Sequence, residues 1–535
     1  MDHVELVILF LLVAVAAVGA LARIIGVPYP ILLVVGGCLA GFVPGVPDVE
    51  LEPDLVLLIF LPPLLFNAAY FSSARDLRRN ARTITLNAVG LVLLTAALVA
   101  VAAHATIDGL SWAAAFALGA IVSPTDPLAA TAIASRLGVP QRLIAAIEGE
   151  SLVNDGTALV AYRVAVAAAV GGSFDLLDAS SDFVVNALGG IAVGFVVGKL
   201  MVLVFRHIVE DDVVGVTTSL AAGYVGYLPA EHLGVSGVLA AVFVGLVVGR
   251  RSPEIVTPSA RLRGYAFWEV LVFLLNATLF LLVGMQLPGI LEDQDRSAGT
   301  LIGLGVLISV TVIGSRLLWL NTVPYVIRAI DRRPEQRLRR IGWRPRLVAA
   351  WSGLRGAVSL AAALALPEDF PERDLLVFLT LCVIFSTLVF QGLTLPWVIR
   401  MLGVEDDGEG EREELLARRE AAEAAIVHLE RLAEEEWTRT RTVERMAGMY
   451  RFRRARIAQR IGEEGDWYVP DDGEDDDDRW ADLDGRSNAY QRVVREALEA
   501  QRRRIIELRD AGEISDSVLH VLERELDLED QRLEI

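Results

Sequence analysis

Long apolar runs alternate with short polar segments from residue 4 to about residue 402, and the rest of the 535-residue chain is polar. A helix needs about 20 predominantly apolar residues to cross the hydrocarbon core of a bilayer. The runs are long enough for this, so the pattern predicts an all-α polytopic membrane protein with about thirteen transmembrane helices. The predicted spans lie near residues 4–22, 29–45, 54–71, 81–103, 111–135, 141–170, 183–206, 213–229, 234–249, 266–288, 299–328, 346–367 and 374–402.

The polar remainder divides the chain into a membrane domain, residues 1–403, and a tail, residues 404–535. Apolar residues recur at roughly helical spacing in REELLARREAAEAAIVHLERLAEEEW, which predicts an amphipathic helix. YQRVVREALEAQRRRIIELRDAG and SDSVLHVLERELDLEDQRL predict two more helices, with Gly512 as the stop between them. DDGEDDDDR, residues 471–479, is typical of an acidic linker. We expect a helical module that regulates the protein or contacts a dimer partner.

Charge follows the same division. The tail holds 22 arginines and 38 acidic residues, a net charge of −16, which leaves −3 of the total of −19 for the membrane domain. An acidic tail argues against a nucleic-acid partner. Arginine is concentrated in alternate loops of the membrane domain, such as RDLRRNAR (75–82) and RAIDRRPEQRLRRIGWRPR (328–346). By the positive-inside rule these loops are cytoplasmic, which predicts an external N-terminus and a cytoplasmic tail.

The segment IVSPTDPLAATA holds an acid between two prolines inside a predicted span. Pro124 and Pro127 each lack an N–H group and clash with the preceding turn, so the helix should unwind between them. Asp126 suits the N-cap of a second half-helix, and Thr125 adds an oxygen beside the negative end of the first half-helix. Together they predict a cation-binding break. A simple proline kink with Asp126 as its cap is the alternative.

The next span begins with AAIEGESLVNDGTALVAYRV, residues 145–164. Ser151 and Asp155 are four residues apart, as are Glu150 and Asn154, and that spacing puts each pair on one helix face. Charged groups inside a bilayer are costly and therefore suggest a function. Oxygen ligands suit hard cations, and the carboxyl group of Asp155 also binds a proton. We therefore expect proton and cation to compete for it.

Two arginines also lie inside apolar runs. Arg316 needs an acidic partner if it is buried, and Glu150 remains for that role once Asp155 is assigned to the ion. The alternative makes Glu150 a ligand and turns Arg316 towards a water-filled funnel. Arg355 lies in WSGLRGAVSLAAALALP, a glycine-interrupted span that takes the same place in the second half of the chain as the SPTDP span takes in the first. Broken helices in matching positions indicate inverted repeats; a glycine-packed helix with Arg355 reaching the interface is the alternative.

Four motifs, SPTDPLAA, EGESLVNDGTAL, SRLLW and SGLRGAVSLA, together resemble the monovalent cation/proton antiporters of the NhaP and NHE branch (CPA1), in family order. LPPLLFNAAY (61–70) also resembles them. The resemblance covers residues 1–402 and implies an NhaA-like fold with two crossing broken helices. It also implies a homodimer and an alternating-access exchange of sodium for protons.

The resemblance also implies roles for individual residues. It implies an ion-binding site of Asp155, Asp126, Asn154, Thr125 and Ser151, with Na⁺ held at Asp155, Asp126, Thr125 and Ser151 and with Asn154 and Asp155 as an ion-binding pair. It implies a structural ion pair between Glu150 and Arg316 and a supporting role for Arg355. Some relatives carry an acid where this chain has Asn67, so a ligand from that helix is left open.

The expected function is exchange of Na⁺, or of Li⁺, for H⁺ across the plasma membrane, for pH and sodium homeostasis. Because Asn154 is neutral, the exchange is expected to be electroneutral, one ion for one proton. A K⁺/H⁺ antiporter on the same scaffold is an alternative, since ion selectivity depends on cavity size and ligand field. An intramembrane aspartyl protease, with Asp126 and Asp155 sharing a proton, and a signalling protein with an active tail are more distant ones. A secondary transporter of this kind is not an enzyme and is expected to need no cofactor.

Overall fold

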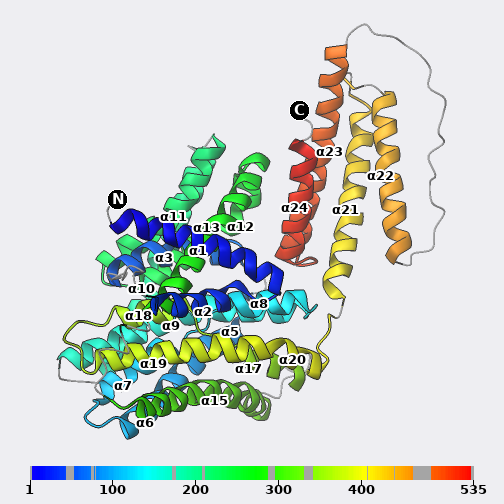
Figure 1. Ribbon diagram of the computed structural model, residues 1–535. Coiled ribbons are helices and arrows are strands. Elements are labelled where there is room, and N and C mark those ends of the chain that lie inside the picture. The colour runs from blue at the N-terminus through cyan, green and yellow to red at the C-terminus, as the bar shows by residue number, and fades with distance from the viewer. Residues whose placement is uncertain are drawn as a thin grey trace.

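The computed structural model describes residues 3–531 apart from residues 44–52, 74–76, 79, 172–175, 208–210, 287–288, 290–295, 331–340, 407, 436, 439 and 462–482. The described chain is helical throughout, without a β-strand. Several predicted loops, and the predicted acidic linker at 471–479, lie wholly or partly outside the described residues. Figure 1 shows the helices of the membrane domain gathered in one bundle, with the tail helices to one side.

The helices of the membrane domain follow the predicted spans closely. They are α1 (His3–Ile25), α2 (Tyr29–Gly41), α3 (Pro53–Tyr70), α5 (Ala81–Thr85), η1 (Leu86–Leu91), α6 (Val92–Thr106), α7 (Trp112–Val122), α8 (Leu128–Arg136), α9 (Gln141–Gly171), α10 (Leu176–His207), α11 (Asp212–His232), α12 (Gly237–Ile255), α13 (Pro258–Met285), α15 (Ala298–Ile330), α17 (Trp343–Trp351), α18 (Ala357–Leu364), α19 (Arg373–Phe385), η2 (Ser386–Gln391) and α20 (Gly392–Leu402). Here η marks a π-helical turn inside a longer helix.

Every predicted span overlaps a helix or a pair of helices. Among the described residues, seven helices are long and apolar enough by themselves to cross a membrane, and four shorter apolar helices accompany them. The number of thirteen crossings stays a prediction. Helix α13 begins eight residues before the predicted span. The prediction starts too late because the first turns of the helix carry Arg261 and Arg263, and hydropathy alone assigns such polar residues to a loop.

Two of the predicted spans are broken, as the sequence predicted. The chain is not helical from Ser123 to Pro127, between α7 and α8, or from Gly353 to Gly356, between α17 and α18. Proline explains the first break, since it removes a hydrogen-bond donor and crowds the preceding turn. Close packing explains the glycines of the second break. A Cβ atom at Gly353 would collide with Arg316, and one at Gly356 would collide with Asp126.

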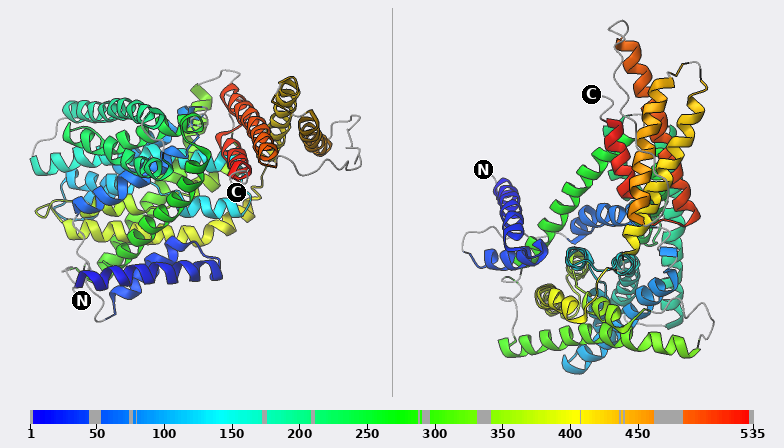
Figure 2. Two further views of the ribbon diagram at one scale, coloured as in Figure 1. Left: turned by 90° about the horizontal axis from the view of Figure 1, so that it is seen from above. Right: turned by 90° about the vertical axis from the view of Figure 1, so that its right-hand side faces the viewer.

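The described part of the tail forms four helices: α21 (Glu409–Leu432), α22 (Thr440–Ile461), α23 (Leu483–Ala511) and α24 (Asp516–Gln531). Helices α21, α23 and α24 correspond to the predicted ones, and Gly512, with φ of 83°, ends α23. Helix α22 was not predicted, because its many arginines mask a buried stripe of Val443, Met446 and Tyr450. Figure 2 shows the tail helices side by side, outside the membrane bundle.

A buried ion cluster joins the tail to the membrane domain. Arg261 at the start of α13 donates to Asp527 of α24 at 2.7 and 3.0 Å and to Glu523 at 3.3 Å. All three side chains are buried. Ser73, after α3, donates to Asp516 at 2.7 Å. Because a buried charge is tolerated only with partners, these contacts fix α24 against the ends of α3 and α13.

Candidate cation site

The two unwound segments cross each other and are joined by their backbones. The N–H group of Asp126 in the first segment donates to the carbonyl of Leu354 in the second at 2.8 Å. Arg355, only 1% exposed, donates from Nε to the carbonyl of Val122 at 3.1 Å, and its Nη1 contacts the carbonyl of Gly353. The guanidinium group thus satisfies carbonyls that the two breaks release at the ends of α7 and α17. This supports the unwound backbone inside the bundle, where water is scarce.

The carboxylate of Asp126 lies between the N-termini of two half-helices. Its Oδ1 accepts a hydrogen bond from the N–H group of Leu128 at 2.9 Å. Helix α8 starts at Leu128, so Pro127 rather than the predicted Asp126 takes the N-cap position. Gly356, directly before α18, packs against its Oδ2 side. The N-terminus of a helix carries a partial positive charge, so both half-helices stabilise a negative charge at this position.

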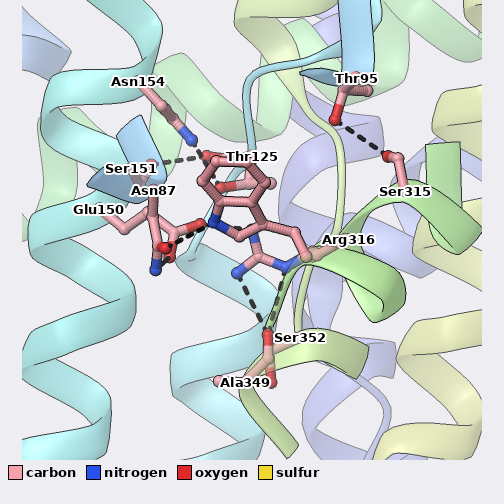
Figure 3. A network of polar contacts seen from close by, with 12 residues as sticks. Asn87, Thr95, Thr125, Glu150, Ser151, Asn154, Ser315, Arg316, Ala349 and Ser352 are labelled. Atoms are coloured by element: carbon pink, nitrogen blue, oxygen red, sulfur yellow. Dashed lines mark hydrogen bonds and ion pairs between the residues drawn. The ribbon is translucent and has the colours of Figure 1, made fainter. Parts of the chain in front are cut away.

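Helix α9 holds the first unwound segment in place. Ser151 donates from its hydroxyl group to the carbonyl of Thr125 at 2.6 Å, and Asn154 donates from Nδ2 to Oγ1 of Thr125 at 2.8 Å. Figure 3 shows both side chains reaching from their helix to Thr125. Ser151 and Thr125 also line the cavity described below, whereas Asn154 does not. Its predicted role as an ion ligand therefore stays a prediction, and its observed contact orients Thr125.

Asp155 is buried on the next turn of α9. Unlike Ser151 and Asn154 on the same helix, its side chain has no hydrogen bond or ion pair with any other residue that the structure describes. Its side chain lines the same cavity as Asp126. A buried carboxylate without a fixed partner is unfavourable as an anion, so it requires a mobile cation or a proton.

A cavity of about 290 Å³ contains both aspartates. Its polar lining comes from α3 and the residues just after it, from the first unwound segment, and from the helices α8, α9, α13 and α18. It consists of Asn67, Ser72, Thr125, Asp126, Thr131, Glu148, Ser151, Asp155, Asn276 and Ser359. A second cavity of about 260 Å³ shares Phe71, Ser72 and Glu148 with it and extends to Glu409, Glu413 and His520 of the tail. The tail thus lines a second cavity that adjoins the one with the aspartates.

Glu150 faces away from this cavity, towards the other side of α9. It forms an ion pair with Arg316 of α15, which is 2% exposed and also donates to the carbonyl of Ala349 at 3.1 and 3.2 Å (Figure 3). Asn87 donates to Glu150 at 3.0 Å and accepts from Trp319 at 3.0 Å. The carboxylate and the guanidinium are therefore surrounded by fixed partners, and neither lines the cavity.

Sequence reasoning missed several polar residues of this region, among them Asn87, Asn276 and Ser359. Each is a single polar residue inside an apolar run, and such residues usually bond within their own helix. Asn276 does so, donating to the carbonyl of Val272 at 2.9 Å. Asn87 lies in η1, and π-helical turns often mark functional sites. The sequence therefore offered one signal, a polar residue inside an apolar span. That signal does not distinguish these residues from polar residues that only hydrogen-bond to their own helix backbone.

The arrangement suits a small cation. Its donors are carboxylate, hydroxyl, amide and carbonyl oxygens, which hard cations prefer. Among the described residues, no group of three or more His, Cys, Asp or Glu side chains is placed to hold a tightly bound metal ion. Asp126 and Asp155, with neutral oxygens around them, fit an ion that enters and leaves, whereas the third carboxylate of the lining, Glu148, is exposed.

Comparisons with known proteins show which family and which fold the chain resembles. The sequence pattern of the family described as sodium/hydrogen exchanger, transmembrane, matches residues 8–401. An uncharacterized Na⁺/H⁺ exchanger of Mycobacterium tuberculosis is 36% identical over 99% of this chain and 96% of its own length. The Na⁺/H⁺ antiporter ApNhaP of Aphanothece halophytica is 35% identical over 75% of each chain. A sodium, potassium, lithium and rubidium/H⁺ antiporter of Bacillus subtilis is 34% identical over 73% of this chain and 61% of its own.

Among solved structures, the sodium proton antiporter MjNhaP1 of Methanocaldococcus jannaschii at pH 8 has the same fold. The TM-score is 0.58 at 19% identity, over 75% of this chain and all of that one. The long match to the mycobacterial relative includes the tail, whereas ApNhaP matches over three quarters of the chain.

Proposed function

Because the chain belongs to the sodium/hydrogen exchanger family, and is therefore a membrane antiporter of monovalent cations and protons, we propose that it exchanges Na⁺ for H⁺ at Asp155. Asp126, Thr125 and Ser151 complete the ligand set, and Asn154 orients Thr125. Li⁺, which is smaller and harder than Na⁺, is a second substrate. The exchange needs no cofactor, since the ion gradients drive it.

The observation that carries this proposal is the contrast between Asp155 and Glu150, the other buried carboxylate of α9, which has Arg316 and Asn87 as fixed partners. Asp155 lines the cavity and lacks a hydrogen-bond or ion-pair partner among the described residues. A cation neutralises it in one state and a proton in the other. Because the two ligands use the same oxygens, binding of one requires release of the other. Alternating access of the cavity to the two sides of the membrane converts this competition into exchange.

Electroneutral exchange follows from the number of titratable groups that change. Asp126 is stabilised as an anion by the N-termini of α8 and α18 in both states. Asn154 adds an amide and no charge. One carboxyl group therefore alternates between one proton and one cation, and the cycle moves no net charge. A membrane potential, otherwise worth about 2.3 kcal/mol per charge per 100 mV, has no effect on such a cycle.

The remaining features complete the proposal. The protein is a homodimer in the plasma membrane, with its N-terminus outside and its tail, residues 404–535, in the cytoplasm, where arginine-rich loops also lie. The tail regulates entry to the cavity, as the adjoining second cavity that it lines suggests. Arg355 supports the crossing of the unwound segments, and Glu150 with Arg316 holds α9 against α15. Asn67 lines the cavity as a neutral ligand or ligand-adjacent group.

A K⁺/H⁺ exchanger is the second candidate. The name of the Bacillus subtilis relative includes potassium and rubidium, so this family admits larger ions. The oxygen ligands of the site do not by themselves separate Na⁺ from K⁺.

Proton flux in reconstituted vesicles tests the proposal. Outward gradients of Na⁺, Li⁺ and K⁺ are imposed in turn, and a pH dye follows proton movement at clamped potentials of 0 and about −100 mV. We expect Na⁺ and Li⁺ to drive flux that does not depend on the potential. Flux driven by K⁺ alone would favour the second candidate, and flux that responds to the potential would contradict electroneutrality.

A further inference from the structure

Ser359 carries a buried hydroxyl group with no hydrogen-bond partner among the residues that the structure describes. Its side chain is 1% exposed and lines the cavity that contains Asp126 and Asp155. Buried polar groups nearly always have a partner, so an exception needs an explanation, such as an ion or a water molecule.

Other buried hydroxyl groups of the protein behave differently. Thr380 donates to the carbonyl of Leu376 at 2.8 Å, and Ser352 donates to that of Val348 at 2.8 Å. This bond to the carbonyl three or four residues earlier is the usual solution for Ser and Thr in helices. Of the buried Ser and Thr residues in the described chain, Ser359 alone has an Oγ without a partner.

The second broken helix explains why Ser359 is an exception. The residues four and three positions before it are Arg355 and Gly356, which lie in the unwound segment rather than in a helical turn. Their carbonyls are therefore not in the position that a regular helix would provide. The break that lets Gly356 pack against Asp126 also leaves the hydroxyl of Ser359, in the first turn of α18, without its usual acceptor.

The geometry points to Ser359 as a further ligand of the transported cation, supplied by the second broken helix. This inference rests on the proposed exchange and adds a ligand that the sequence motifs did not indicate. A hydroxyl oxygen has lone pairs for a hard cation, and it adds no charge, so the one-for-one stoichiometry is kept. The cation then bridges both broken helices, with Thr125 and Asp126 on one and Ser359 on the other. Binding is strongest when the two are correctly aligned.

Ser359→Ala tests this assignment, because it removes the oxygen and little else. Loss of an unsatisfied buried hydroxyl is neutral or stabilising in cation-free buffer, so the variant is expected to fold. Cation-dependent thermal stabilisation of the purified protein reports binding, and the half-saturating Na⁺ concentration of vesicle flux reports transport. We expect both to shift to about tenfold higher Na⁺, equivalent to about 1.4 kcal/mol.

Three matched variants sharpen the test. Thr380→Val removes a buried hydroxyl outside the cavity, and it should leave the Na⁺ dependence unchanged. Ser359→Thr keeps the oxygen, and it should retain affinity. Ser359→Cys keeps nearly the same volume but offers a soft sulfur, and it should weaken Na⁺ binding as Ala does.

Parent-like Na⁺ dependence in both Ser359→Ala and Ser359→Cys would overturn the assignment while leaving the exchange proposal intact. If the parent itself shows neither stabilisation nor flux with Na⁺, Li⁺ or K⁺, the proposed function fails, and the assignment of Ser359 fails with it.

Discussion

Glu150 and Asp155 lie on the same membrane helix, less than two turns apart, and both are buried carboxyl groups. Glu150 has an arginine and an asparagine as fixed partners and lies outside the cavity. Asp155 has neither partner and lines the cavity. The difference teaches that charge inside a membrane span does not by itself indicate a transport role. An acid with permanent partners stabilises the fold, whereas an acid without them is available to a mobile ion.

The largest effect on exchange, apart from the loss of Asp155 itself, is expected at Asp126, the second carboxylate on the cavity side. Asp126→Asn keeps the volume and removes the negative charge that two half-helix N-termini stabilise. We expect exchange to fall by at least about a hundredfold, equivalent to 2.7 kcal/mol or more at 1.36 kcal/mol per tenfold, with normal folding. Vesicle flux and size-exclusion profiles measure both.

The control for this variant is Glu254→Gln, which removes an exposed carboxylate of α12 that pairs with Arg251. It should exchange like the parent. Asp126→Asn with flux within a factor of two of the parent would remove Asp126 from the site.

Loss of a partner on the other face of α9 should damage folding rather than ion affinity. Arg316→Ala leaves Glu150 buried without its counter-charge, which typically costs about 3–5 kcal/mol. We expect low yield and a strongly lowered melting temperature. Any surviving protein should keep the parent's half-saturating Na⁺ concentration.

Arg163 and Glu231 form a matched exposed pair, and Arg163→Ala should cost no more than about 1 kcal/mol. A stable Arg316→Ala protein with a changed Na⁺ affinity would instead assign Arg316 to the cation pathway.

A methyl group added where the two unwound segments cross should displace Asp126 without removing any functional group. In Gly356→Ala the new Cβ would collide with Asp126, so the carboxylate or the second unwound segment must move. Overpacking typically costs about 1–3 kcal/mol, and we expect flux to fall by about tenfold or more. Gly303→Ala on α15, where a Cβ meets open space, is the control. Equal flux in the two variants would show that the crossing tolerates displacement.

The smallest effect is expected at the tail. Glu523 of α24 is, like Glu150 and Asp155, a buried acid; it has a fixed partner in Arg261, and its pKa lies near neutral pH. Burial raises the pKa of Glu523 to about 7, and Arg261 opposes that shift. A raised pKa means that the docked state favours the protonated form. The contribution of Glu523 to the stability of the docked tail is therefore complete below the usual pKa of 4.5, and it is lost as pH rises through about 7. Burial lowers the pKa of the neighbouring His520, which therefore stays neutral above pH 6.5 and does not compensate.

We therefore expect α24 to undock more readily at pH 8.5 than at pH 6.5. Hydrogen exchange of α24 in the full-length protein, corrected for intrinsic rates, measures this, and Glu523→Gln should flatten the difference. The other charged groups that face the cluster are Arg261, Arg502, Arg509, Asp516 and Asp527. Protection that does not change with pH in the parent would rule out Glu523 as the sensitive group.

Much of the fold could be predicted from sequence, because spans and breaks have local causes. Apolar length predicts a helix that crosses the membrane, and Pro124 with Pro127 predicts an unwound segment. The motifs also brought together the residues that the structure places around Thr125 and Asp126. What sequence could not supply was the direction of each side chain. Asn154 orients Thr125 and does not line the cavity, and Ser359 lines it although nothing in its local sequence separates it from other helix serines. Such facts depend on how two distant breaks cross.

Sodium-driven proton flux of Asp155→Asn, compared with the parent over a series of pH values in the same vesicles, tests the central claim most directly. At low pH protons occupy Asp155 of the parent and Na⁺ binds poorly, and at high pH no proton is available for return. The account therefore predicts a parent flux that passes through a maximum in pH, and a folded Asp155→Asn protein with no flux at any pH. Asp155→Asn flux near the parent rate, with the same pH dependence, would contradict the account.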